Sequence, residues 1–236
     1  TLLDRSVRNY TLKKSLFAAN KNLTIVPCSE WMASFVKESF LKDKRIQTIH
    51  NGVDLNVFTP TTRGTQTSET FKVLAVSSVW TPEKGILDIY QLREMLPEDV
   101  EIVMVGVSEK QQQQLPKGIR GIQRTQNIQE LVKLYNEADV LINPTYADTF
   151  PTVNLEALAC GTPVITYNTG GSPEAIDEKT GVVVPQGDVK ALADAILQMK
   201  KHPLSSADCR NRAEKLFNKD KCFEQYINLY NELLSK

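Results

Sequence analysis

The stretch "DTFPTVNLEALACG", residues 148–161, lies between two apolar runs, "ADVLINPT" at 138–145 and "TPVITYN" at 162–168. Short runs rich in Val, Ile and Leu are typical of strands that are buried on both faces of a parallel sheet. The stretch between them has helical character, so the three together predict a strand, a helix and a second strand. Proline is tolerated only in the first turn of a helix, which places the helix start at Pro151 and makes Phe150 its N-cap.

The same alternation of apolar runs and amphipathic helical stretches continues from Lys72 onward. The expected strands lie at 71–78, 100–107, 118–123, 138–145, 162–168 and 181–185. The expected helices between them lie at 83–96, 127–138, 151–160, 172–176 and 188–201. This order predicts an α/β fold, a parallel sheet with helices on both faces. We expect Asn127, Gly161 and Ser172 to cap helix ends, and the glutamines at 111–114 to form a solvated loop.

Composition divides the chain into three parts. Residues 1–43 contain a basic helix, one short strand and a second helix, which cannot close a sheet by themselves, so we expect them to end a domain whose beginning is absent. Residues 44–218 open with another strand at 45–52 and contain the alternating pattern. Residues 219–236 form a helix whose apolar stripe must pack on something. The chain is therefore expected to be a fragment.

Charge and composition exclude several classes of protein. Lys plus Arg and Asp plus Glu balance at 28 each, which gives no electrostatic case for nucleic acid or for an anionic membrane surface. The four cysteines form no CxxC pair, so we predict reduced, structural cysteines and no metal site. No apolar run approaches the roughly 20 residues that span a bilayer. A cytoplasmic protein is expected, and attachment to a membrane surface or to a partner stays open.

The helix that starts at Pro151 is expected to bind an anion. Phenylalanine has no side-chain acceptor, so Phe150 cannot cap the helix. The N–H groups of Thr152, Val153 and Asn154 are then left without a side-chain acceptor at the positive end of the helix. Because the preceding strand ends at the mouth of the sheet, these groups face the place where parallel α/β folds bind ligands. A diphosphate suits that place.

Two carboxylates flank this helix start and indicate a polyol on either side of a diphosphate. Glu156 lies about one turn into the helix, where it suits the two hydroxyls of a ribose. Asp148, in the loop before the helix, suits a second sugar. The alternatives are a simple turn residue for Asp148 and a solvated residue for Glu156. The apolar neighbours Leu155 and Ala157 disfavour the second alternative, because an unpaired carboxylate among them is costly.

Two further features converge on the same edge of the sheet. Lys84 follows the first full strand and precedes Gly85 at a helix start, where a lysine is a common phosphate ligand; a solvated surface lysine is the alternative. Gly170 and Gly171 in "NTGGSPEA" permit close backbone approach, and a plain turn is an equal alternative. Together with the two acids, these residues predict a nucleotide-sugar site.

At these residues the sequence resembles family 4 of the GT-B glycosyltransferases, the group 1 retaining enzymes. Four blocks carry the resemblance: "IHNGVDLNVFTP" (49–60), "PEKG" (82–85), "LYNEADVLINPTYADTFPTVNLEALACGTPVIT" (134–166) and "GGSPEAI" (170–176). The resemblance covers about 1–236. It implies that 44–218 is a Rossmann-like donor-binding domain, that 1–43 ends the acceptor-binding N-terminal domain, and that 219–236 crosses back to pack on that domain.

The resemblance also implies roles for single residues. The family has two glutamates separated by seven residues, and Asp148 and Glu156 have that spacing. The family places the first acid at the transferred sugar and the second at the nucleotide ribose. Lys84 corresponds to the phosphate-binding lysine. The other donor-binding residues that the resemblance implies are Phe150, Thr152, Val153 and Asn154 at the helix start, and Thr125 and Gln126 in the loop near the base.

The chain departs from the family in three places. Asp148 is shorter than glutamate by one methylene group. Pro151 stands where the family usually has glycine, which removes one backbone N–H from the anion site. Val79 stands five residues before Lys84, where an arginine commonly accompanies the lysine. Lys84 would therefore be the sole side-chain cation for the phosphates.

The implied reaction is retaining transfer of a hexose from a UDP- or GDP-sugar to a glycan or lipid-linked saccharide, with Asp148 and Lys84 as catalytic residues. No metal or other cofactor is predicted, because the sequence contains no Asp-x-Asp pair. The expected partners are the donor, the acceptor and the missing N-terminal domain. Without that domain the chain is expected to bind a donor but to turn over poorly. The alternative is a non-catalytic module that binds a nucleotide-sugar or scaffolds a partner.

Overall fold

The computed structural model describes residues 4–61 and 70–235, and its main feature is a six-stranded sheet in which all neighbouring strands are parallel. The strand order is β5-β4-β3-β6-β7-β8. The strands are β3 (Phe71–Val76), β4 (Val100–Val105), β5 (Ile119–Ile122), β6 (Val140–Asn143), β7 (Val164–Tyr167) and β8 (Gly181–Val184). Each strand lies inside its predicted range, so the predicted Rossmann-like α/β fold is confirmed.

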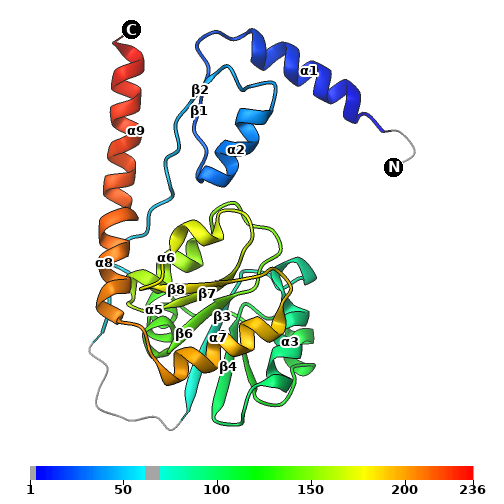
Figure 1. The fold of residues 1–236 in the computed structure, drawn as a ribbon, viewed down its shortest axis with the longest axis vertical. Coiled ribbons are helices and arrows are strands. Elements are labelled where there is room, and N and C mark those ends of the chain that lie inside the picture. Colours follow the sequence, from blue (N-terminus) through cyan, green and yellow to red (C-terminus); the bar gives the residue numbers. More distant parts are fainter. Residues whose placement is uncertain (1–3, 62–69, 236) are drawn as a thin grey trace.

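Helices cover both faces of this sheet (Figure 1). The first face carries α3 (Ile86–Met95) and α7 (Val189–Lys201), and the second carries α5 (Ile128–Glu137), α6 (Thr152–Ala159) and α8 (Ser206–Leu216). Strand β3 explains why the strand sequences are almost continuously apolar. Its Val73 and Ala75 enter the core under α3 and α7, whereas Leu74 between them enters the core under α5 and α6.

The residues before β3 form a smaller part of the molecule. Helices α1 (Ser6–Ala19) and α2 (Glu30–Glu38) accompany a two-stranded parallel sheet of β1 (Thr24–Ile25) and β2 (Arg45–Ile46). The strands predicted at 22–29 and 45–52 are thus present but short, and they pair with each other. Helix α1 projects away from the rest of the chain and buries none of its residues (Figure 1).

The C-terminal helix α9 (Lys219–Leu234) runs back beside this smaller part (Figure 1). Near its end, Glu232 forms an ion pair of 2.5 Å with Arg45 of β2. At its beginning, the N–H of Lys219 donates to the carbonyl oxygen of Val53 at 3.1 Å. The helix therefore contacts both the small sheet and the segment that leads from it toward the large sheet.

Two local predictions are wrong and two are confirmed. The glutamine run is not a loop, because most of it lies in a short helix, α4 (Glu109–Gln113), which Ser108 and Gln111 stabilise with a reciprocal capping box. Ser172 is not an N-cap, because the short 3-10 helix η2 (Ser172–Ala175) begins at Ser172 itself without a capping side chain. Asn127 caps α5 as predicted, since its side chain accepts the N–H of Glu130. All four cysteines are free, as predicted.

Candidate functional site

A cleft with a volume of about 280 Å³ opens at the carboxyl ends of β3 and β6. These strands are neighbours, but the chain continues from β3 toward one edge of the sheet and from β6 toward the other. The cleft therefore lies at the topological switch point, where open α/β sheets bind ligands. Five of the residues predicted to bind the donor or act in catalysis line it: Lys84, Asp148, Phe150, Thr152 and Val153.

The N-terminus of α6 forms one wall of this cleft. The helix begins at Thr152, one residue later than predicted, because Pro151 has an extended conformation with ψ of 120°. No side chain caps the helix, as predicted. In the described part of the chain the N–H groups of Thr152 and Val153 have no acceptor, whereas the N–H of Asn154 donates to the Pro151 carbonyl at 3.3 Å. Two amides at the positive helix end are thus available to an anion.

The opposite wall carries the predicted phosphate lysine. The 3-10 helix η1 (Pro82–Lys84) ends at Gly85, whose φ of 77° favours glycine, and α3 follows directly. The Nζ atom of Lys84 lies 2.9 Å from Oδ2 of Asp148. Both side chains are partly exposed, so this ion pair contributes little to folding stability, about 0–1 kcal/mol. Its consequence is positional, because the ammonium group is held over the cleft beside the uncapped helix.

A second set of contacts, which was not predicted from the sequence, joins the same two segments. The hydroxyl of Tyr146 donates to Oδ2 of Asp88 at 2.8 Å, and the hydroxyl of Tyr167 donates to the same oxygen at 2.6 Å. Asp88 lies one helical turn after Lys84, and Tyr146 lies two residues before Asp148. The carboxylate of Asp88 therefore fixes the acidic loop against the start of α3.

Replacing either tyrosine with phenylalanine tests this attachment. Tyr146 is 38% exposed and Tyr167 is fully buried, so water compensates for the lost hydrogen bond only at Tyr146. We expect the free energy of unfolding to fall by about 0.5 kcal/mol for Tyr146→Phe and by about 1.5 kcal/mol for Tyr167→Phe, measured by urea unfolding. Tyr90→Phe, on α3, is the control. An equal or larger loss for Tyr146→Phe contradicts the assignment.

The glycine pair lies against the acidic loop. Gly170 has a φ of 55°, and a Cβ at this position would lie 1.8 Å from the carbonyl oxygen of Asp148. A Cβ at Gly171 would lie 2.1 Å from the carbonyl oxygen of Thr149. The two glycines therefore permit a close approach of protein backbone, namely that of the loop before α6.

Glu156 lies one turn along α6 from Thr152, is partly buried, and is not among the residues that line the cleft. Its Oε2 atom accepts a hydrogen bond of 2.7 Å from the hydroxyl of Tyr135. Burial raises the pKa of Glu156 above its ordinary value of 4.5, although hydrogen bonds from Tyr135 and Thr152 act in the opposite direction. An ionised carboxylate can accept about four hydrogen bonds, so this one retains acceptor capacity for a ligand.

The aromatic residue before α6 is part of a stack that the sequence did not predict. Phe150 is only 3% exposed. Its ring packs parallel to the imidazole of His50 with 4.7 Å between centroids, and it meets Phe217 edge-on at 5.8 Å. Phe150 therefore lines the cleft while its ring packs against His50 and Phe217.

Besides Glu156, three predicted donor residues do not line the cleft. Asn154 is buried, where its side chain accepts from Asn143 at 3.0 Å. Thr125 and Gln126 follow β5, the edge strand, which is two positions away from β3 and three away from β6. Their contact with the nucleotide base stays a prediction. Val79 is 63% exposed and supplies no charge.

Comparison with known families matches the sequence model described as "Glycosyl transferases group 1" to residues 70–202, which is more than half of the chain. This chain belongs to the group 1 glycosyl transferases. The matched region contains the whole six-stranded sheet and all the residues of the cleft.

Curated relatives of this glycosyl transferase include two proteins named D-inositol 3-phosphate glycosyltransferase. The protein of Mycolicibacterium smegmatis is 31% identical over 192 residues, which cover 72% of this chain and 44% of that protein. The protein of Mycobacteroides abscessus is 31% identical over 170 residues, which cover 64% of this chain and 38% of that protein. The chain thus spans less than half the length of these relatives.

Solved structures confirm the GT-B type of fold. Sucrose-phosphate synthase from Thermosynechococcus elongatus matches with a TM-score of 0.82 and 22% identity, over 98% of this chain and 63% of that one. Anabaena Alr3699/HepE in complex with UDP and glucose matches with a TM-score of 0.78 and 17% identity, over 96% of this chain and 67% of that one. At these identities the likeness concerns the fold alone.

None of the helices within residues 4–61 and 70–235 has both the length and the apolar character needed to cross a bilayer.

Proposed function

We propose that the cleft binds the nucleotide-diphosphate sugar of a retaining hexosyl transfer. The observation that carries this proposal is the meeting, at the switch point of the sheet, of the Lys84 ammonium group with the two free amides of α6. Each favours an anion, and a cleft of about 280 Å³ at this point accommodates a diphosphate with part of its sugar. Membership of the group 1 glycosyl transferases supports the same assignment.

The residues around the cleft contact different parts of such a donor. Lys84 and the amides of Thr152 and Val153 neutralise the charge that grows on the diphosphate as it leaves, and so stabilise the transition state. Asp148, released from Lys84 by the phosphates, accepts hydroxyl protons of the sugar. Glu156 accepts those of the ribose. Thr125 and Gln126 approach the base. No metal ion is assigned a role in donor binding or in the transfer.

The acceptor is placed outside this cleft. We propose a hydroxyl of a glycan or of a lipid-linked saccharide, held by an N-terminal domain of which residues 1–43 are the end. The relatives that share 31% identity carry D-inositol 3-phosphate in their names, which supports a hydroxylated acceptor of that general kind. By itself the chain is then a donor-binding part with little turnover. We propose a cytoplasmic protein that works there or at the inner face of the membrane.

A donor-binding module without catalysis is the second candidate. It is favoured by the ion pair that already occupies Lys84 and by the exposed Val79 at the place of the family's arginine. Both features weaken the attraction of the cleft for phosphate relative to the family. This candidate shares the donor site and differs only in the chemical step.

Isothermal titration calorimetry with UDP, GDP and a panel of their hexose conjugates tests the site. We expect one of the two nucleotides to bind and one of its sugar conjugates to bind more tightly than the nucleotide alone. A chain that binds none of these ligands contradicts the proposed function. Assaying hexose transfer with the chain joined to its full N-terminal domain then separates the enzyme from the non-catalytic module.

A further inference from the structure

Glu174 connects the donor domain to the small N-terminal part. It lies in η2, but its carboxylate accepts the N–H of Glu30 at 2.8 Å and the N–H of Trp31 at 2.8 Å, which are the first two amides of α2. A carboxylate at a helix N-terminus forms charge-assisted hydrogen bonds and also meets the positive end of the helix dipole. These bonds join residues more than 140 positions apart in the sequence.

The same carboxylate of Glu174 also contacts the imidazole of His50, which packs against Phe150 at the cleft. Nε2 of His50 lies 3.0 Å from Oε2 of Glu174, which is the oxygen that also accepts from Glu30. On its other side the His50 ring stacks on Phe150, with 4.7 Å between centroids and 22° between planes. Phe150 lines the cleft directly before α6. A continuous series of contacts therefore leads from α2 through Glu174 and His50 to the donor site.

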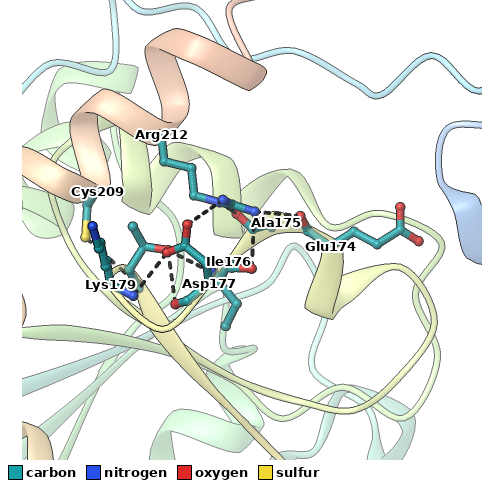
Figure 2. Close-up of polar contacts among 8 residues, drawn as sticks. Glu174, Ala175, Ile176, Asp177, Lys179, Cys209 and Arg212 are labelled. Atoms are coloured by element: carbon teal, nitrogen blue, oxygen red, sulfur yellow. Dashed lines mark hydrogen bonds and ion pairs between the residues drawn. The ribbon is translucent and has the colours of Figure 1, made fainter.

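Arg212 of α8 fixes the backbone from which Glu174 extends. Its guanidinium donates to the carbonyl oxygens of Ala175 at 2.7 Å and Ile176 at 3.2 Å, and it pairs with Asp177 at 2.6 Å. Figure 2 shows this cluster on one side of the loop, with the Glu174 carboxylate pointing the other way. The side chain of Glu174 is thus anchored at its base, and its charged end is left for α2 and His50.

The two parts also touch closely around this carboxylate. Ser29, the fully buried N-cap of α2, lies so near Gly171 that a Cβ there would come within 2.8 Å of the Ser29 Cβ. Since Gly171 is also against the acidic loop, a shift of α2 would press on the loop that carries Asp148. Both α2 and the acidic loop are therefore packed close to Gly171.

We propose that Glu174 is a positioning residue. It binds the N-terminus of α2 and the ring of His50, and so holds Phe150 and the start of α6 in the conformation that binds the donor. The structural part of this inference stands on the contacts alone, whereas its effect on affinity rests on the proposed function. Because α2 belongs to the N-terminal part, a change in the position of that part would also alter the cleft through Glu174 and His50.

The chain has two histidines, which allows a measurement that needs no donor. In nuclear magnetic resonance spectra, the ring protons of His50 carry a shift caused by the stacked Phe150, and those of His202 serve as an internal reference. We expect Glu174→Ala to move the His50 signals toward the values of an unstacked histidine and to leave His202 in place. Amide exchange at Trp31 is expected to become about tenfold faster, the usual effect of losing a helix cap.

Donor affinity provides the second readout. We expect Glu174→Ala to weaken binding of the sugar nucleotide about three- to tenfold and Glu174→Gln to weaken it less, because the amide keeps one acceptor oxygen. In a His50→Ala background the effect of Glu174→Ala on affinity should largely disappear, which a general loss of stability would not produce. Glu178→Ala, an exposed carboxylate in the same loop, is the matched control.

Unchanged His50 signals in both Glu174 variants would contradict the proposal that Glu174 holds the His50 ring on Phe150. Changed signals with unaltered donor affinity, or fully additive effects of the Glu174 and His50 substitutions, overturn the positioning role. If the unmodified chain binds no donor at all, the proposed function fails, and the histidine signals still decide whether Glu174 holds His50 on Phe150.

Discussion

Lys84→Met is expected to bind the sugar nucleotide about 30- to 100-fold more weakly than the unmodified chain. The substitution removes the ammonium group that faces the cleft and keeps most of the side-chain volume. A hydrogen bond to a charged group contributes about 1.5–3 kcal/mol, which corresponds to about 10- to 150-fold in affinity, and the expected loss lies inside this range. The loss is increased because the carboxylate of Asp148, which is no longer paired with Lys84, then repels the phosphates. Calorimetric titration of the donor measures it directly.

Three further variants make this result specific. Lys133→Met removes a lysine that is 73% exposed on α5, and it should leave affinity unchanged. Lys84→Arg keeps the charge and should lose less than Lys84→Met. Adding Asp148→Asn to Lys84→Met should restore part of the affinity for the nucleotide without its sugar, since it removes the unpaired carboxylate. A loss below threefold in Lys84→Met would show that the phosphates bind elsewhere.

The large sheet and the place of the cleft were predictable because both depend on local sequence patterns. Continuous apolar runs define strands that are buried on both faces, and the order of strands and helices allows few topologies. The helix start at Pro151 was predicted to within one residue. The error arose because proline fixes φ but leaves ψ free, and Pro151 has an extended ψ.

The contacts around the cleft were not predictable because they join residues that are distant in the sequence. Asp88 meets Tyr146 and Tyr167 across 58 and 79 positions, and His50 meets Glu174 across 124. Nothing in the segment around each of these residues indicates its partner. Only the fold brings them together, so a single sequence carries no local signal for them.

Substitutions of Glu156 are expected to change donor affinity and stability in opposite directions. Glu156→Gln should weaken donor binding about 10- to 50-fold, because a neutral amide offers the ribose one acceptor oxygen in place of a carboxylate. The same change should raise the free energy of unfolding at pH 7 by about 0.5–2 kcal/mol, the usual gain when a functional residue that costs stability is replaced. The glutamine side chain can still accept the hydrogen bond of Tyr135.

The pH dependence of this stability gain identifies its cause. Burial raises the pKa of Glu156 in the folded chain above its ordinary value of 4.5, so between these two values the folded state holds a proton that the unfolded state has lost. The contribution of Glu156 to stability is therefore complete below pH 4.5 and is lost as the pH rises through the folded pKa. The stability advantage of Glu156→Gln should accordingly be present at pH 7 and vanish toward pH 4.5, as measured by urea unfolding across that range.

The control is Glu94→Gln, which replaces an exposed carboxylate on α3 and should show no such trend. An advantage that persists at low pH would mean that burial of the Glu156 charge is not its cause. An advantage without a loss of donor affinity would mean that Glu156 does not bind the ribose.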